Sequence, residues 1–200
     1  MNFIETIAAL EALYTAPNPK SLTKVVSHFT PNYRSWVEAS RFVILSTVGP
    51  EGTDASPRGD DGPVVKIADE KTVLIPDWQG NNRLDSLHNI VRDPRVSLMF
   101  MVPGSDNVVR INGSAKLTAD ESVVAQFDKS GLRPRSVIVV TIEEMYFQCA
   151  KALMRSRLWS SSQDAKSVPT AGQFLMEQAT IEDAISYDEG YASYAKEKMW

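Results

Sequence analysis

The sequence predicts a mainly β, α+β fold: a six-stranded antiparallel barrel of Greek-key type, with helical segments before and after it. Three observations predict this fold. Short β-branched and apolar runs recur between residues 41 and 148, and tight turns separate them. Several runs are joined by turns of about four residues, which suit antiparallel hairpins better than parallel βαβ units. Residues 1–40 and 149–200 show helical patterns instead. We expect a single domain over residues 1–200.

The segment 1–40 is expected to form three short helices, which prolines separate. Asn2 and Glu5 stand at the spacing of a capping box at the start of the first helix. Thr30 is the expected N-cap of the third helix, and Pro31 takes its first helical position.

The barrel core is expected over residues 41–148 and contains six or more strands with one short helix inserted. Most of the strands are rich in β-branched and apolar residues, the more polar 53–58 is expected as the return strand of the first hairpin, and sequences such as "GPEG" and "PGSD" provide the turns. The expected strands are 41–48, 53–58, 63–67, 72–76, 95–102, 107–118 and 136–149. The expected helices of this part are 81–92 and 119–130, the second closed by Gly131.

The segment 149–200 is expected to be helical over 150–159, 171–179 and 180–198. Its last helix begins with "TIED", which is similar to a capping box. The serine-rich stretch 160–172 is the nearest feature to a linker.

Composition excludes several classes of function. Of the 200 residues, 43% are hydrophobic and 23% charged, which is typical of an ordinary globular protein. A net charge of −4 argues against a general binder of nucleic acid or of anionic membranes. No segment reaches the ~18 consecutive apolar residues of a membrane span, and the N-terminus lacks the basic region of a signal peptide. With Cys149 alone no intramolecular disulfide can form, so we expect a reducing, cytoplasmic location.

Familiar catalytic motifs are absent. The sequence contains no phosphate loop, no GxGxxG, no HExxH, no paired CxxC and no GxSxG elbow. His28 and His88 are the only histidines, so we expect no histidine-rich metal site, and His88 is interpreted as structural. No catalytic acid or base can be assigned from the sequence.

The stretch "QGNNRLDSL" is the first of four basic features beside turns or helix ends. Asn81 or Asn82 is a candidate N-cap for the expected helix, and Arg83 would follow it. Backbone N–H groups at a helix start bind anions, and Arg83 and Ser86 would add side-chain donors to a phosphate. The alternative is an ordinary capped helix on the surface.

The other three features place basic residues at strand and helix positions. In "ASPRGD", Gly59 would let a ligand approach the backbone, while Arg58 supplies a fixed donor fork; the alternative is a turn with a solvated arginine. Arg110 lies on a strand and faces solvent, a site or a subunit interface. Lys151 and Arg155 share one helical face, so they repel each other unless an anion or carboxylates neutralise them. Together these positions favour a phosphate-bearing cofactor.

Residues 34–159 resemble the FMN-binding split-barrel superfamily that includes pyridoxamine 5′-phosphate oxidase. The resemblance rests on "RFVILSTVGPEGTDASPRGD", "TVLIPDWQGNNRLDSLHNIVRDPRVSLMFMVPG" and "VVRINGSAKL", taken in that order. The later "CAKALMRSRLW" looks like a motif of a bacterial subgroup of flavin-binding relatives. The resemblance implies an FMN-binding split barrel and a homodimer with FMN at the subunit interface.

The resemblance also implies positions for the cofactor-binding residues. The stretch 55–59 would lie along the flavin, Pro76 and Asp77 would lie beside its ring, and later basic residues would approach across the dimer interface. The implied set is Ser56, Pro57, Arg58, Gly59, Pro76, Asp77, Asn82, Arg83, Ser86, Lys151, Arg155 and Arg157.

Departures from the oxidase itself argue against its vitamin B6 substrate. The chain has "ASPRG" and "GNNR" where the oxidase has an RxxLLK-like strand and an SRK phosphate motif, and no histidine or arginine follows Trp159. We therefore expect an FMN-dependent oxidoreductase of unknown substrate, with NAD(P)H or another electron donor as partner. The alternatives are a flavin carrier or sensor without turnover, and a barrel that holds haem or deazaflavin. Haem is disfavoured because only two imidazoles are present.

Overall fold

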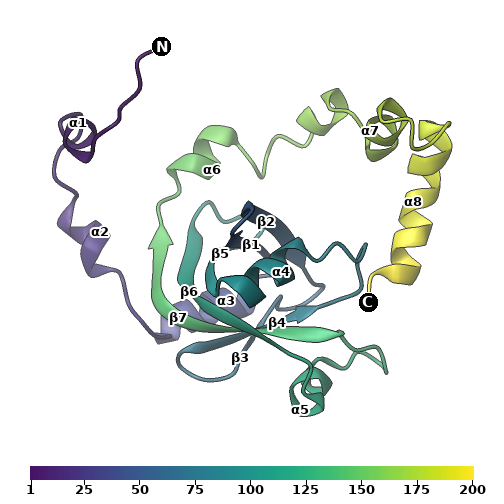
Figure 1. The fold of residues 1–200 in the computed structure, drawn as a ribbon, viewed down its shortest axis with the longest axis horizontal. Coiled ribbons are helices and arrows are strands. Elements are labelled where there is room, and N and C mark those ends of the chain that lie inside the picture. Colours follow the sequence, from purple (N-terminus) through teal and green to yellow (C-terminus); the bar gives the residue numbers. More distant parts are fainter.

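The computed structural model describes all 200 residues and has an antiparallel sheet flanked by helical segments. The sheet curls around one core, and helical arms lead away from it at both ends of the chain (Figure 1). The strands are β1 (Phe42–Gly49), β2 (Gly52–Gly59), β3 (Lys66–Ile67), β4 (Thr72–Asp77), β5 (Arg95–Met101), β6 (Val108–Thr118) and β7 (Ser136–Gln148). The α-helices are α1 (Ile7–Glu11), α2 (Pro19–Thr23), α3 (Pro31–Ala39), α4 (Asp85–Arg92), α5 (Glu121–Val124), α6 (Lys151–Ser156), α7 (Ala171–Glu177) and α8 (Ala184–Lys198), and 3₁₀ turns cover Ala125–Phe127 and Asp164–Ser167.

The strands form one seven-stranded sheet in the order β2-β1-β5-β6-β7-β4-β3, and every pairing is antiparallel. The predicted fold class is confirmed, with one difference in the number of strands. The seventh strand is β3, which pairs over only two residues. The stretch expected to be a strand at 63–67 is a strand only at its end, because the chain bends at Val64 and Val65.

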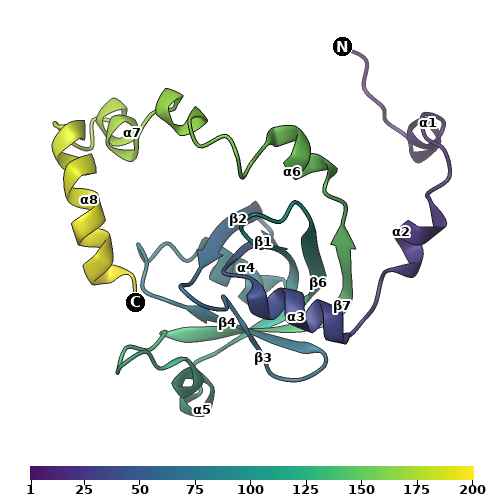
Figure 2. The ribbon, with the colours of Figure 1, turned by 180° about the vertical axis from the view of Figure 1, so that it is seen from behind.

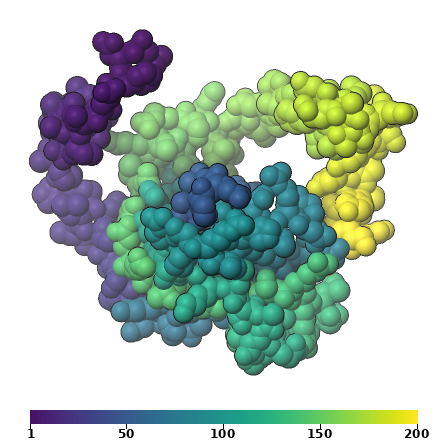
Figure 3. All heavy atoms as spheres, in the orientation of Figure 1, coloured from purple at the N-terminus to yellow at the C-terminus, as the bar shows by residue number.

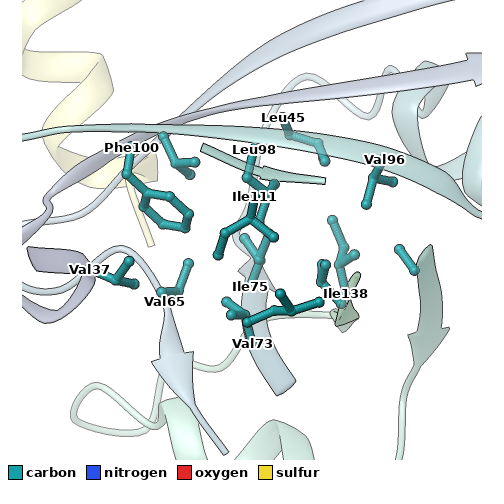
Figure 4. Close-up of a cluster of buried hydrophobic side chains, with 14 of the residues drawn as sticks. Val37, Leu45, Val65, Val73, Ile75, Val96, Leu98, Phe100, Ile111 and Ile138 are labelled. Carbon is teal, nitrogen blue, oxygen red and sulfur yellow. The ribbon is translucent and has the colours of Figure 1, made fainter. Parts of the chain in front are cut away.

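One hydrophobic core lies inside the curled sheet. Leu45 of β1, Leu98 of β5 and Ile111 of β6 are fully buried in the same cluster as Ile75 of β4 and Ile138 of β7. Figure 4 shows these side chains converging from different strands. Because strands from both halves of the sheet share one core, the sheet has the form of a barrel that is not closed by backbone pairing.

The first arm, residues 1–40, contains three short helices before the barrel, as predicted. Thr30 caps α3 and Pro31 lies in its first turn, which was also predicted. Figure 2 shows α3 lying against the barrel, while α1 and α2 continue away from it. The predicted capping box at Asn2 is wrong, because Thr6 caps α1 instead. Neither α1 nor α2 contains a buried residue.

The second arm contains α6, α7 and α8, and an open gap separates much of it from the barrel (Figure 3). The last helix is shorter than predicted: it begins at Ala184, because Asp183 accepts hydrogen bonds from two first-turn N–H groups. The expected helix 119–130 is also shorter and ends at Phe127. None of the helices combines the length and the apolar character that a membrane crossing requires.

Candidate functional site

The main pocket lies between the ends of β2 and β4 and has a volume of about 570 Å³. It brings together eight of the predicted cofactor-binding residues, which come from β2, from β4 and from the turn that follows β4. These eight are Ser56, Pro57, Arg58, Gly59, Pro76, Asp77, Asn82 and Arg83. The pocket also includes Asp60, Trp78, Arg135, Met199 and Trp200, which the sequence did not indicate.

An ion pair between Arg58 and Asp77 joins β2 to β4 across the pocket wall. β2 and β4 are not neighbours in the sheet and share no backbone hydrogen bonds. The two side chains therefore connect the strands across the split, which is the unpaired gap between β2 and β4. The two side chains are only 18% and 17% exposed. The Nε of Arg58 is buried and has no hydrogen-bond partner within the chain. A buried donor without a partner is costly, so the chain alone does not satisfy this guanidinium.

The turn after β4 forms the other end of the pocket. Asn81 Oδ1 accepts a hydrogen bond of 3.0 Å from the backbone N–H of Arg83, and Asn82 has a left-handed φ of 59°. Arg135 Nη1 donates to Asn82 Oδ1 at 3.0 Å. Arg135 directly precedes β7, and β4 and β7 pair up to Asp77, so the pairing of these two strands brings Arg135 to the turn.

The predicted start of the helix at 81–92 is wrong. The helix begins at Asp85, so Asn82 is not its N-cap and Arg83 lies in the turn before it. The amide of Asn81 bonds to the backbone of the turn, which competes with helix formation. No side chain caps the first turn of α4.

Arg83 is an exposed pocket arginine that pairs with a neighbouring carboxylate. Its side chain is 79% exposed, and Nε donates to Asp85 Oδ2 at 2.7 Å. An exposed pair of this kind contributes little stability. Arg83 can therefore exchange its carboxylate for another anion at small cost.

The remaining predicted residues do not line the pocket. Ser86 is buried on α4, and its hydroxyl donates to a carboxylate oxygen of Asp54. Lys151, Arg155 and Arg157 are exposed on or just after α6. Their roles at a cofactor stay predictions.

Sequence reasoning missed a second cluster at the pocket. Trp78 follows β4, and its Nε1 donates to Asp60 Oδ2 at 3.2 Å. Lys129 Nζ contacts the same carboxylate at 2.5 Å, and Trp200 packs on Trp78 and Lys129. Of these, only Trp78 and Asp60 could have been found from the sequence, because they directly follow the predicted pocket strands.

A family model described as pyridoxamine 5′-phosphate oxidase matches residues 29–149, which is more than half of the chain. The chain therefore belongs to the split-barrel family related to pyridoxamine 5′-phosphate oxidase. The match includes the strands and the turn that form the pocket, but not residues 199–200. No curated protein matches the sequence significantly.

Solved structures with a similar fold come from several bacteria. HupZ of Group A Streptococcus is 15% identical and has a TM-score of 0.48, with 58% of this chain and 91% of that chain covered. A candidate pyridoxamine 5′-phosphate oxidase of Lactobacillus delbrueckii is 19% identical, with a TM-score of 0.47 and coverages of 60% and 95%. An FMN-binding protein of Syntrophomonas wolfei is 14% identical, with a TM-score of 0.41 and coverages of 58% and 88%.

Proposed function

We propose that the chain binds FMN in the pocket between β2 and β4 and acts as an FMN-dependent oxidoreductase on a small molecule. The proposal rests on the presence of two kinds of hydrogen-bond donor in one pocket, a largely buried arginine at the wall and arginines at the turn. Arg58, whose buried Nε has no partner within the chain, lines one wall, and Arg83 and Arg135 lie at the turn after β4. FMN carries a polar ring system and a phosphate, which need these two kinds of donor.

The turn suits the phosphate end of the cofactor. Arg83 can form a charge-assisted contact, and the first-turn N–H groups of α4 lack a side-chain cap. Asn82 would hold Arg135 in place through their hydrogen bond. Ser86 could contact the phosphate only if its hydroxyl gave up its hydrogen bond to Asp54.

The strand ends suit the ring end. Ser56, Pro57 and Gly59 would line one side, and Pro76 and Asp77 the other. The Arg58–Asp77 pair would fix the orientation of the ring by holding the two strand ends together. When bound, FMN supplies hydride or electron transfer, and the protein supplies binding, orientation and electrostatics. NAD(P)H is a suitable class of electron donor.

A flavin carrier or sensor without turnover is the second candidate. It is favoured by the pairing of the pocket carboxylates: Asp77 is bound to Arg58, and Asp60 to Lys129 and Trp78. No free carboxylic acid is therefore ready to transfer a proton. Oxidation of NAD(P)H by the flavin-loaded protein with a panel of acceptors would support the oxidoreductase, and its complete absence would support the carrier.

We also propose that the protein is a homodimer in which the subunits share the FMN sites. Support comes from the arms, where Ile7, Leu13 and Met154 are more than half exposed although they are apolar. Lys151, Arg155 and Arg157 lie outside the pocket of their own chain, so they would act at the pocket of a second copy.

Substitution of Arg83 tests the FMN site. Arg83→Ala should weaken FMN binding by about 1.5–3 kcal/mol, because a charge-assisted contact is lost while an exposed side chain leaves the fold unaffected. Arg95→Ala is a matched control: Arg95 is also exposed, and it also pairs with an aspartate two residues away, Asp93. Equilibrium titration of both variants with FMN checks the prediction. Equal affinities for FMN would remove Arg83 from the site.

A further inference from the structure

The indole of Trp200 lies at the pocket, although the helix before it packs elsewhere. Helix α8 packs against α7, where the backbone N–H of Gly172 donates to Asp188 Oδ1 at 2.9 Å. Within the second arm, only Met199 and Trp200, which follow α8, line the pocket. Figure 1 shows the arm looping around and returning to the barrel at this end. The contacts of the indole itself therefore hold it there.

Those contacts are the ones that recognise an aromatic ring. Trp78 meets Trp200 edge to face, with ring centroids 5.3 Å apart and an interplanar angle of 82°. Lys129 Nζ lies 3.4 Å from the centroid of the Trp200 ring and 5.4 Å from that of Trp78. A cation so close to a ring centroid is attracted to the electron-rich face of the ring.

The groups around the indole are held in place without it. Lys129 Nζ donates to Asp60 Oδ1 at 2.5 Å and to Asp61 Oδ1 at 2.7 Å. The side chain of Asp60 is only 6% exposed, and it also accepts from Trp78. Partial burial lowers the pKa of Lys129, but the hydrogen bonds to the two carboxylates outweigh burial and raise the pKa above its ordinary value. Lys129 therefore keeps its charge and its position over a wide range of pH.

We propose that Trp78, Lys129 and Asp60 form a subsite for a planar, electron-rich aromatic ring, and that Trp200 occupies it as an internal ligand. The assignment of this ring to a substrate rests on the proposed FMN site, since Asp60, Trp78 and Trp200 line the same pocket, while Lys129 lines the adjoining hollow that shares Asp60 and Trp78. The substrate class is then a small neutral aromatic compound, such as an indole or a phenol. Two carboxylates against one ammonium disfavour an anionic substituent at this wall.

The internal ligand sets an expectation for affinity. While the indole of Trp200 occupies the subsite, an external ring must compete with it. The apparent affinity for that ring is then reduced in proportion to the fraction of molecules in which Trp200 has left the subsite. Removing the indole from the 200-residue chain removes this competition. Trp200 is thus a selectivity element: a ring enters only if it replaces the same contacts.

Indole itself is the probe for this subsite. Calorimetric titration should show that the Trp200→Ala variant binds indole at least about tenfold more tightly than the unaltered protein. Tyr194→Ala is the matched control, because Tyr194 is an exposed aromatic residue of α8 that does not line the pocket. Equal indole affinity in the Trp200→Ala variant and the unaltered protein would overturn the proposal.

Further substitutions in the Trp200→Ala background test the composition of the subsite. Lys129→Gln should weaken indole binding by roughly tenfold, whereas Lys129→Arg keeps the cation and should retain most of it. Lys129→Arg and Trp78→Phe are conservative controls for misfolding. Lys129→Arg keeps a cation beside Asp60, and Trp78→Phe keeps an aromatic ring in the subsite. If the affinity for indole does not depend on the charge at residue 129, the proposed role of Lys129 is refuted.

The same variants separate this proposal from the FMN site. The double variant Arg83→Ala/Trp200→Ala should lose FMN affinity but bind indole as Trp200→Ala does. If FMN never binds but indole follows these expectations, the FMN proposal fails and the aromatic subsite stands. If FMN binds and indole binds no variant, the subsite fails and the FMN proposal stands.

Discussion

Arg58 and Arg83 show how burial gives the same side chain two different roles. Arg58 is largely buried, joins two strand ends through Asp77, and presents an unpartnered Nε. Arg83 is exposed and pairs only with a near neighbour in the sequence. Loss of Arg83 should therefore affect binding alone, whereas loss of Arg58 should affect both binding and stability.

Arg58→Met should lower the free energy of unfolding by about 1–3 kcal/mol, because it leaves the carboxylate of Asp77 with little solvent and no cation. Arg34→Met provides the control: its pair with Glu38 is exposed and should contribute under about 0.5 kcal/mol. Urea denaturation measures both. Adding Asp77→Asn to Arg58→Met should recover part of the loss. Equal stability of the two single variants would show that the Arg58–Asp77 pair does not hold the split together.

At the scale of elements, the strands were predictable because local patterns determine them. Alternating apolar residues and the turn "GPEG" place β1 and β2 within one or two residues of their predicted limits. The start of α4 was not predictable from capping preferences, because Asn81 bonds to the turn instead. Arg135 and Trp200 reach the pocket through strand pairing and chain packing, which no local pattern encodes.

Gly113 tests the packing of β6 on β7. The pairing of these strands shifts register between Asn112 and Gly113, and a Cβ on Gly113 would lie 2.0 Å from the carbonyl oxygen of Thr141. Gly113→Ala should therefore destabilise the protein by about 1–3 kcal/mol. Gly190→Ala has open space on α8 and should be neutral or slightly stabilising. Thermal unfolding compares the two, and an unchanged midpoint for Gly113→Ala would mean that the bulge relaxes freely.

At the scale of the whole molecule, the arms are the basis for the proposed homodimer. They carry exposed apolar side chains and leave three basic residues away from the pocket of their own chain. Sedimentation equilibrium should give a mass twice the 22.2 kDa of the chain. A monomer that binds FMN with full affinity would contradict the proposal that the subunits share the site.

The absorption spectrum of the purified protein, dialysed after incubation with excess FMN, is the decisive test of FMN binding. The proposed site predicts the two flavin bands, in the blue and the near ultraviolet, at one FMN per chain. A colourless protein that does not retain FMN, or one that shows a haem Soret band, would rule out the proposed FMN site.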